Sequence, residues 1–160
     1  MRPNKIIDAW NEGRSAVNIF LSTPGSFTAE VMASLGWDAV TVDMQHGVID
    51  YSNLIPMFQG ITQYDPAPMV RVPWNDPAII MKSLDAGAYG VICPMINSME
   101  ECERFVGACR YAPRGYRSTG PIRAVFYSGA DYHEHADETV LTLAMIETQE
   151  SVDNLDSICS

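Results

Sequence analysis

The chain alternates short apolar runs with longer stretches that are apolar on one side only. The apolar runs are rich in β-branched residues and end at polar or glycine-containing turns, as strands do. They span residues 17–21, 39–43, 69–72, 90–94 and 141–147, with residues 118–126 as a weaker sixth strand. Near-continuous apolar strands, each followed by a one-sided helix, are typical of parallel strands covered by helices. The pattern therefore predicts an α/β fold, either a barrel or a doubly wound sheet.

The intervening stretches show helical spacing. An apolar residue recurs every fourth position at Phe27, Val31 and Leu35, and the repeat ends at Gly36. We expect this stripe to face the core. A second apolar stripe follows Ser52 and consists of Leu54, Ile55, Phe58 and Ile61. A third stretch is expected to turn its apolar residues toward the core: Cys102, Phe105, Val106 and Cys109.

Two of these helices carry clear start signals. Asp76 is placed to cap a helix that has Pro77 in its first turn, and Gly87 suits the left-handed residue at its end. Ser98 followed by Glu101 forms a capping-box pattern before the next helix.

Composition narrows the class of protein. The 160 residues suit a single domain spanning 1–160, and 47% apolar with 19% charged residues indicates a folded core. A formal net charge of -10 disfavours nucleic acid and anionic membranes as partners. Without an apolar run long enough for a membrane span, or a signal-peptide core, we expect a cytoplasmic protein. The four cysteines contain no CxxC pair and are expected to be free thiols.

Residues able to do chemistry stand where the predicted strands end. Neither GxGxxG nor GxxxxGK[ST] occurs, which favours a barrel over a nucleotide-binding sheet. In α/β folds the carboxyl ends of strands carry the functional groups. Those ends hold Asp43, Gln45, His46, Arg71, Pro94, Met95 and Glu147.

Each of these residues has a structural and a chemical interpretation. His46 is either a turn residue or a base, and Asp43 in the same tight turn could fix its tautomer. Arg71 suits either an ion pair or a substrate carboxylate. Glu147 is either a residue near a helix start or a ligand for a hard divalent ion.

A rival metal site lies in the sequence DYHEHADE. His133 and His135 would share a face in a strand, and Asp131 is close by in the chain. The acidic, helix-like surroundings favour a solvated surface instead.

Four ordered motifs together resemble one family. VDMQHG, MVRVPWNDPAIIMKSLDAGAYGVICPMI, YAPRGYRSTGPIRA and AMIETQESVDNLDSI run from about Asn18 to the end of the chain. In this order they resemble the HpcH/HpaI aldolases, the class II pyruvate aldolases typified by 4-hydroxy-2-oxoheptanedioate aldolase, which take part in aromatic compound catabolism.

The resemblance implies a (β/α)8 TIM barrel that reversibly splits a 4-hydroxy-2-oxo acid into pyruvate, or a close relative of it, and an aldehyde. It also implies a divalent metal cofactor (Mg, Mn or Co) and a homo-oligomer. By match to the family motifs, His46 would be the base, Asp43 its orienting carboxylate, Arg71 the substrate-binding arginine and Glu147 a metal ligand. Cleavage leaves a carbanion beside the ketone, which a metal and Arg71 would stabilise as an enolate.

This chain departs from the family pattern in two residues and in length. Gln45 stands where many members carry Glu, and Met145 where some carry Gln, so both are expected to affect substrate range. A barrel of this type takes about 250 residues. We therefore expect about the first six βα units here, with Glu147 after the sixth strand and the second metal-ligating Asp absent.

Several functions remain open at this point. A citryl-type lyase or a citrate-forming condensing enzyme would share the enolate chemistry. A catalytically silent barrel that serves as an assembly module would fit the absent ligand. A metal-binding domain centred on His133 and His135 is a third class.

Overall fold

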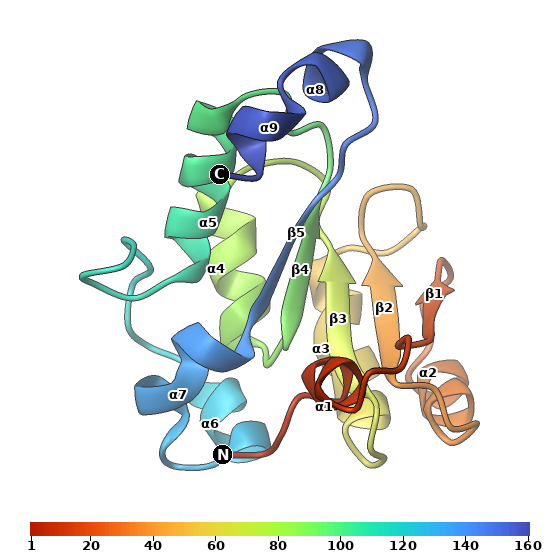
Figure 1. Cartoon of the computed structure of the whole chain (residues 1–160). Coiled ribbons are helices and arrows are strands. Elements are labelled where there is room, and N and C mark those ends of the chain that lie inside the picture. The colour runs from red at the N-terminus through yellow and green to blue at the C-terminus, as the bar shows by residue number, and fades with distance from the viewer.

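The computed structural model describes all residues from 1 to 160 and contains one parallel sheet of five strands (Figure 1). The strands pair in chain order, so each is joined to its neighbour by a crossover on which helices lie. They are β1 (Asn18–Leu21), β2 (Ala39–Asp43), β3 (Ala67–Arg71), β4 (Gly90–Cys93) and β5 (Leu141–Ala144). The α/β prediction is confirmed, and consecutive parallel pairing is the order found in (β/α)8 barrels.

The helices form three groups, one on a face of the sheet and one at each end of its strands. Those that cover one face are α2 (Ser26–Ala33), α3 (Tyr51–Ile61), α4 (Pro77–Asp85) and α5 (Met99–Cys109). Those at the amino-terminal ends of the strands are α1 (Lys5–Asn11), α6 (Ile122–Ser128) and α7 (Tyr132–Thr139) (Figure 1). The carboxyl ends carry α8 (Gln149–Asp153) and α9 (Leu155–Ile158). None of these helices combines the length and apolar content needed to cross a bilayer.

The two faces of the sheet bury different side chains. Val40, Val42 and Val70 belong to the main core, which lies between the sheet and α2–α5. Side chains alternate along a strand, so Asp43 and Arg71 point to the opposite face. Met69, two residues before Arg71, packs there in a smaller apolar cluster. The alternation thus places an acid and a base together at the carboxyl ends of β2 and β3.

The predicted helix starts are largely correct. The Asp76 carboxylate accepts from the Ala78 N–H, Pro77 opens α4, and Gly87 takes a φ of 104° after the helix ends. The Ser98 hydroxyl accepts from the Glu101 N–H at the start of α5. The Glu101 carboxylate, however, accepts from the Asn97 N–H, so the box is shifted by one residue.

The prediction for α2 was wrong. Phe27, Val31 and Leu35 are exposed, and Phe27 shows 75% of its surface. The buried residues of this helix are Ala29 and Ala33. A Cβ added at Gly60 of α3 would lie 2.6 Å from the Ser26 carbonyl oxygen, so α2 and α3 approach too closely for large side chains between them.

The weak sixth strand was also wrong. Residues 118–126 form a loop and the start of α6, so the chain holds five βα units where six were expected. The last strand ends at Ala144, which leaves Glu147 three residues beyond the fifth strand. A capped helix start at Thr148 ends the extended segment, because its hydroxyl accepts from the Ser151 N–H.

Candidate active site

A bidentate ion pair between neighbouring strands is the centre of the site. Arg71 donates through Nε to Asp43 Oδ1 at 2.9 Å and through Nη2 to Asp43 Oδ2 at 2.6 Å. The two residues are register partners at the carboxyl ends of β2 and β3. The side chain of Asp43 is 3% exposed and that of Arg71 is 16% exposed. Sheet register and burial together fix this pair.

The surroundings keep both partners charged. Burial opposes ionisation of Asp43, but hydrogen bonds from Arg71 and from the His46 and Gln45 N–H groups hold its pKa below the ordinary value. The hydrogen bonds to Asp43 raise the pKa of Arg71 against the effect of burial, and the charge of Glu147 adds to the rise. Glu147 therefore acts on Arg71 electrostatically across the sheet edge.

The turn after β2 places His46 differently from our expectation. Asp43 Oδ1 accepts from the backbone N–H groups of Gln45, at 3.1 Å, and His46, at 3.2 Å. Oδ1 thus accepts from both Arg71 and the turn, Oδ2 accepts from Arg71 alone, and no hydrogen bond joins Asp43 to the imidazole. A Cβ at Gly47 would collide with the Asp43 carbonyl oxygen, which keeps this turn tight. The His46 side chain is exposed and the side-chain oxygen of Gln45 is buried without a hydrogen-bond partner.

A backbone contact holds Glu147 at the same edge. The Met95 N–H donates to Glu147 Oε1 at 2.8 Å. Met95 is the single non-glycine residue with positive φ, at 57°. Such a conformation costs about 1 to 2 kcal/mol for an L-residue, and residues held in it concentrate at functional sites. The strain at Met95 turns its N–H toward the carboxylate.

Asn97 connects the loops that carry Met95 and Glu147. Its Nδ2 donates to the Met95 carbonyl at 3.3 Å, and its Oδ1 accepts from the Thr148 hydroxyl. Its own carbonyl accepts from Asn154 Nδ2 at 2.8 Å. No sequence pattern indicated Met95 as a backbone donor or Asn97 as the link, because both act through loop geometry.

The rival metal site does not form. His133 and His135 lie on α7, where two residues of separation place side chains on different sides of a helix. His133 stacks on Tyr111, and Asp131 pairs with the chain's amino group. Across the whole chain, no three His, Cys, Asp or Glu side chains are grouped so as to hold a metal ion.

The groups at the carboxyl edge of the sheet are those of an enzyme that handles small acids. A parallel α/β sheet presents a paired arginine, a carboxylate held by a backbone N–H, and an exposed histidine on adjoining loops at its carboxyl edge. Such groups can bind an oxo acid and move a proton. Residues 17–160 match the family model described as HpcH/HpaI aldolase/citrate lyase, and the chain belongs to this family.

Named relatives agree with this placement. The chain is 48% identical over 157 residues to a hydroxypyruvate/pyruvate aldolase of Rhizorhabdus wittichii, covering 98% of this chain and 62% of the relative. It is 34% identical over 158 residues to a 4-hydroxy-2-oxo-heptane-1,7-dioate aldolase of Salmonella dublin, covering 97% and 60%.

A solved structure is similar throughout the chain. The citrate synthase SbnG superimposes with a TM-score of 0.85 at 34% identity, covering 99% of this chain and 61% of that one. The chain thus spans about three fifths of the length of these relatives.

Proposed function

We propose that this chain carries the oxo-acid-binding part of a metal-dependent aldolase, which reversibly cleaves a 4-hydroxy-2-oxo acid to pyruvate and an aldehyde. The observation that carries the proposal is the buried Asp43–Arg71 pair beside the tethered carboxylate of Glu147. The names of the two aldolase relatives support a small 2-oxo acid as the substrate.

Arg71 is the group proposed to bind the oxo acid. Its Nε and Nη2 are held by Asp43, which leaves Nη1 without a protein partner. A guanidinium fixed in this way can donate to a carboxylate or to a ketone oxygen that gains negative charge. In place of orienting His46, Asp43 then acts as the positioning residue for Arg71.

His46 is proposed to move the proton. In cleavage the C3–C4 bond breaks, its electron pair passes to the enolate of pyruvate, and the C4 hydroxyl proton goes to a base as the aldehyde forms. The exposed imidazole of His46 lies in the turn after β2 and can take this proton directly or through a water. Protonation of the enolate at C3 then gives pyruvate.

Glu147 suits a divalent metal as a single protein ligand. Oε1 accepts from Met95, and no hydrogen bond of the chain occupies Oε2. Mg²⁺ is commonly bound by one or two carboxylates, with water and substrate oxygens completing its shell. When bound, such an ion would withdraw charge from the oxo acid and favour enolisation. Mg, Mn and Co all accept oxygen ligands of this kind.

Citrate formation is the second candidate. It is favoured by the similarity to the citrate synthase SbnG over nearly the whole chain. Gln45 and Met145, which differ from the expected family residues, lie in the turn after β2 and just after β5, where a different acid would be recognised.

Pyruvate release from 4-hydroxy-2-oxoheptanedioate, with Mg or Mn and with EDTA, tests the proposal. We expect metal-dependent release that falls by at least about tenfold in Glu147→Gln, because one charge-assisted ligand is lost. Glu150→Gln, an exposed carboxylate on α8, is the matched control. Circular dichroism confirms that each sample is folded. A folded chain without turnover in either direction would support the silent assembly module and refute the aldolase.

We also propose a cytoplasmic homo-oligomer, on the basis of the family, the net charge of -10 and the four free cysteines. Sedimentation of the 160-residue chain measures the oligomeric state directly.

A further inference from the structure

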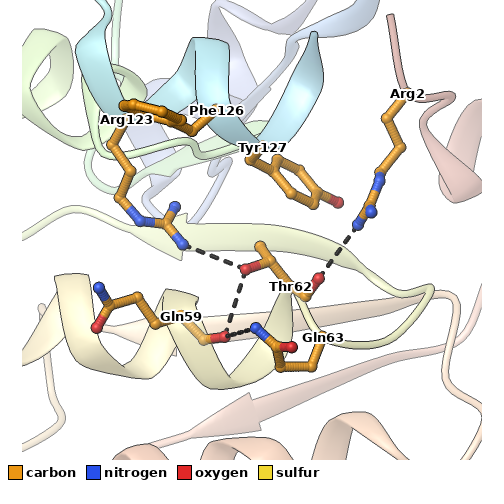
Figure 2. A pocket seen from close by; sticks show the side chains of 7 residues that line it. All are labelled: Arg2, Gln59, Thr62, Gln63, Arg123, Phe126 and Tyr127. Carbon is orange, nitrogen blue, oxygen red and sulfur yellow. Dashed lines mark hydrogen bonds between the residues drawn. The ribbon is translucent and has the colours of Figure 1, made fainter.

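A polar pocket lies away from the Asp43–Arg71 pair, and neither residue lines it. It has a volume of about 370 Å³ and lies between the end of α3, the N-terminal segment and α6 (Figure 2). Its lining contains two cations, two amides, one hydroxyl and two aromatic rings: Arg2, Arg123, Gln59, Gln63, Thr62, Phe126 and Tyr127. We call it the two-arginine pocket.

The pocket is at the opposite end of the sheet from the candidate active site. Thr62 follows the end of α3 and precedes β3, which begins at Ala67. Arg123 reaches the Ala86 carbonyl, which follows α4 and precedes β4. Both positions belong to the amino-terminal ends of the strands, whereas Asp43 and Arg71 lie at the carboxyl ends. The pocket therefore belongs to no part of the site described above.

Neither arginine has an acidic partner. Arg123 donates to the Ala86 carbonyl and to Thr62 Oγ1, and Arg2 donates to the Thr62 carbonyl at 3.2 Å. No carboxylate lies within ion-pair distance of either guanidinium. Of the five N–H groups that a guanidinium carries, three remain free on Arg123 and four on Arg2.

The two cations converge on one place. Both reach Thr62, one at its hydroxyl and the other at its carbonyl, and they approach it from opposite sides in Figure 2. Tyr127 lies between them, with the Arg2 guanidinium 4.5 Å from its ring centre. In a chain with 20 acidic and 10 basic residues, two adjacent unpaired arginines in a pocket are an unusual concentration of positive charge.

We propose that the two-arginine pocket binds a small oxyanion, a carboxylate or phosphate group, between Arg2 and Arg123. The free N–H groups form a donor set suited to paired oxygens, and the Gln59 and Gln63 amides add neutral donors at the rim. Phe126, which is 87% exposed, and Tyr127 offer an apolar wall for the rest of the ligand.

Burial supports this assignment. Desolvation lowers the pKa of the Arg123 guanidinium below its ordinary value, because the charge is partly removed from water without a counter-ion. An anion in the pocket would supply that counter-ion. The hydrogen bonds from Arg123 to the Ala86 carbonyl and to Thr62 Oγ1 are a structural role, but together they occupy only two of its five N–H groups.

Calorimetric titration with inorganic phosphate, and separately with citrate, tests the proposal at constant ionic strength. We expect saturable binding of at least one anion at a dissociation constant below about 1 mM. Arg2→Gln should weaken it about tenfold, because a charge-assisted hydrogen bond is lost. Phe126→Glu, at an exposed position that the fold does not need, should weaken it at least as much by placing a carboxylate at the mouth.

Arg104→Gln is the matched control, since it removes the same charge from an exposed site on α5 outside the pocket. The dissociation constant of the anion in Arg104→Gln should stay within about twofold of the value for the unmodified chain. Absence of saturable binding to both anions would overturn the proposal. So would binding that persists in Arg2→Gln and Phe126→Glu, or that falls equally in Arg104→Gln. The two probes also distinguish a phosphate from a carboxylate ligand. Arg2 and Phe126 line this pocket and not the Asp43–Arg71 site, so a loss of binding in their variants separates this pocket from the proposed aldolase site.

Discussion

Replacing Asp43 with asparagine tests the ion pair that organises the candidate site. The asparagine keeps the shape and one carbonyl oxygen, so it can still accept from the N–H groups of Gln45 and His46 in the turn. It loses the charge and presents an N–H₂ group toward Arg71, which has only donors. The partly buried guanidinium is then left without its counter-ion.

The structure sets the expected size of this effect. Hydrogen bonds to charged groups contribute about 1.5 to 3 kcal/mol, and breaking a buried pair costs about 3 to 5 kcal/mol. Arg71 keeps 16% exposure and can recover some hydration, so we expect a loss of about 2 to 4 kcal/mol in the free energy of unfolding. For a domain of this size, this is roughly 5 to 15 °C in melting temperature.

Urea unfolding followed by circular dichroism measures the loss, with Asp156→Asn as a control that removes an exposed charge. A double-mutant cycle with Arg71→Met isolates the coupling between the two side chains. A loss below about 1 kcal/mol for Asp43→Asn, or no coupling in the cycle, would show that the pair does not stabilise the site.

The same variant predicts a change in the pH dependence of stability. The pKa of Asp43 is lower in the folded than in the unfolded chain, so the unfolded chain binds more protons as the pH falls. The contribution of Asp43 is complete above the ordinary aspartate pKa of about 3.9 and is lost as the pH falls through the folded value. In Asp43→Asn this part of the acid-induced loss should disappear, and an unchanged acid transition would contradict the assignment.

Three further predictions concern the fold. Gly60→Ala should destabilise the chain by about 1 to 3 kcal/mol in urea, since its Cβ would meet the Ser26 carbonyl oxygen at 2.6 Å; a neutral result would mean that α2 shifts freely. Phe27→Ser should change the free energy of unfolding by less than about 0.5 kcal/mol, whereas the same change at a core position would cost about 3 to 5 kcal/mol. With Ellman's reagent the exposed Cys159 should react first, because burial raises the pKa of Cys93 to about 12; rapid labelling of Cys93 in the folded chain would refute this.

The local pattern of apolar and polar residues was sufficient to locate most of the strands and helices. Four of the five strands were located to within two residues at each end, and the α4 cap at Asp76 was identified from its sequence. These features depend on neighbours in the chain: an apolar run between turns, or a carboxylate next to free helical N–H groups. The fifth strand was extended by three residues too many, because its apolar run continues past Ala144.

The face that α2 buries could not be read from its own sequence. Phe27, Val31 and Leu35 share one stripe, and Ala29 and Ala33 share another with the same spacing. The choice between them depends on α3, where Gly60 permits a close approach of the two helices. The strand assigned to residues 118–126 failed for a similar reason, since α6 is stabilised by packing Ala124 beside Tyr132 of α7.

By itself the sequence determined which residues stand at or near the strand ends: Asp43, His46, Arg71 and Glu147, although it put Glu147 inside the last strand and the structure puts it three residues beyond. Only the tertiary structure decided their partners. Strand register placed Asp43 opposite Arg71, so its carboxylate pairs with the guanidinium and not with the His46 ring. A positive φ at Met95 directs its backbone N–H toward Glu147. Partner choice depends on groups that are distant in the chain, and no local pattern encodes the angle at which two loops meet.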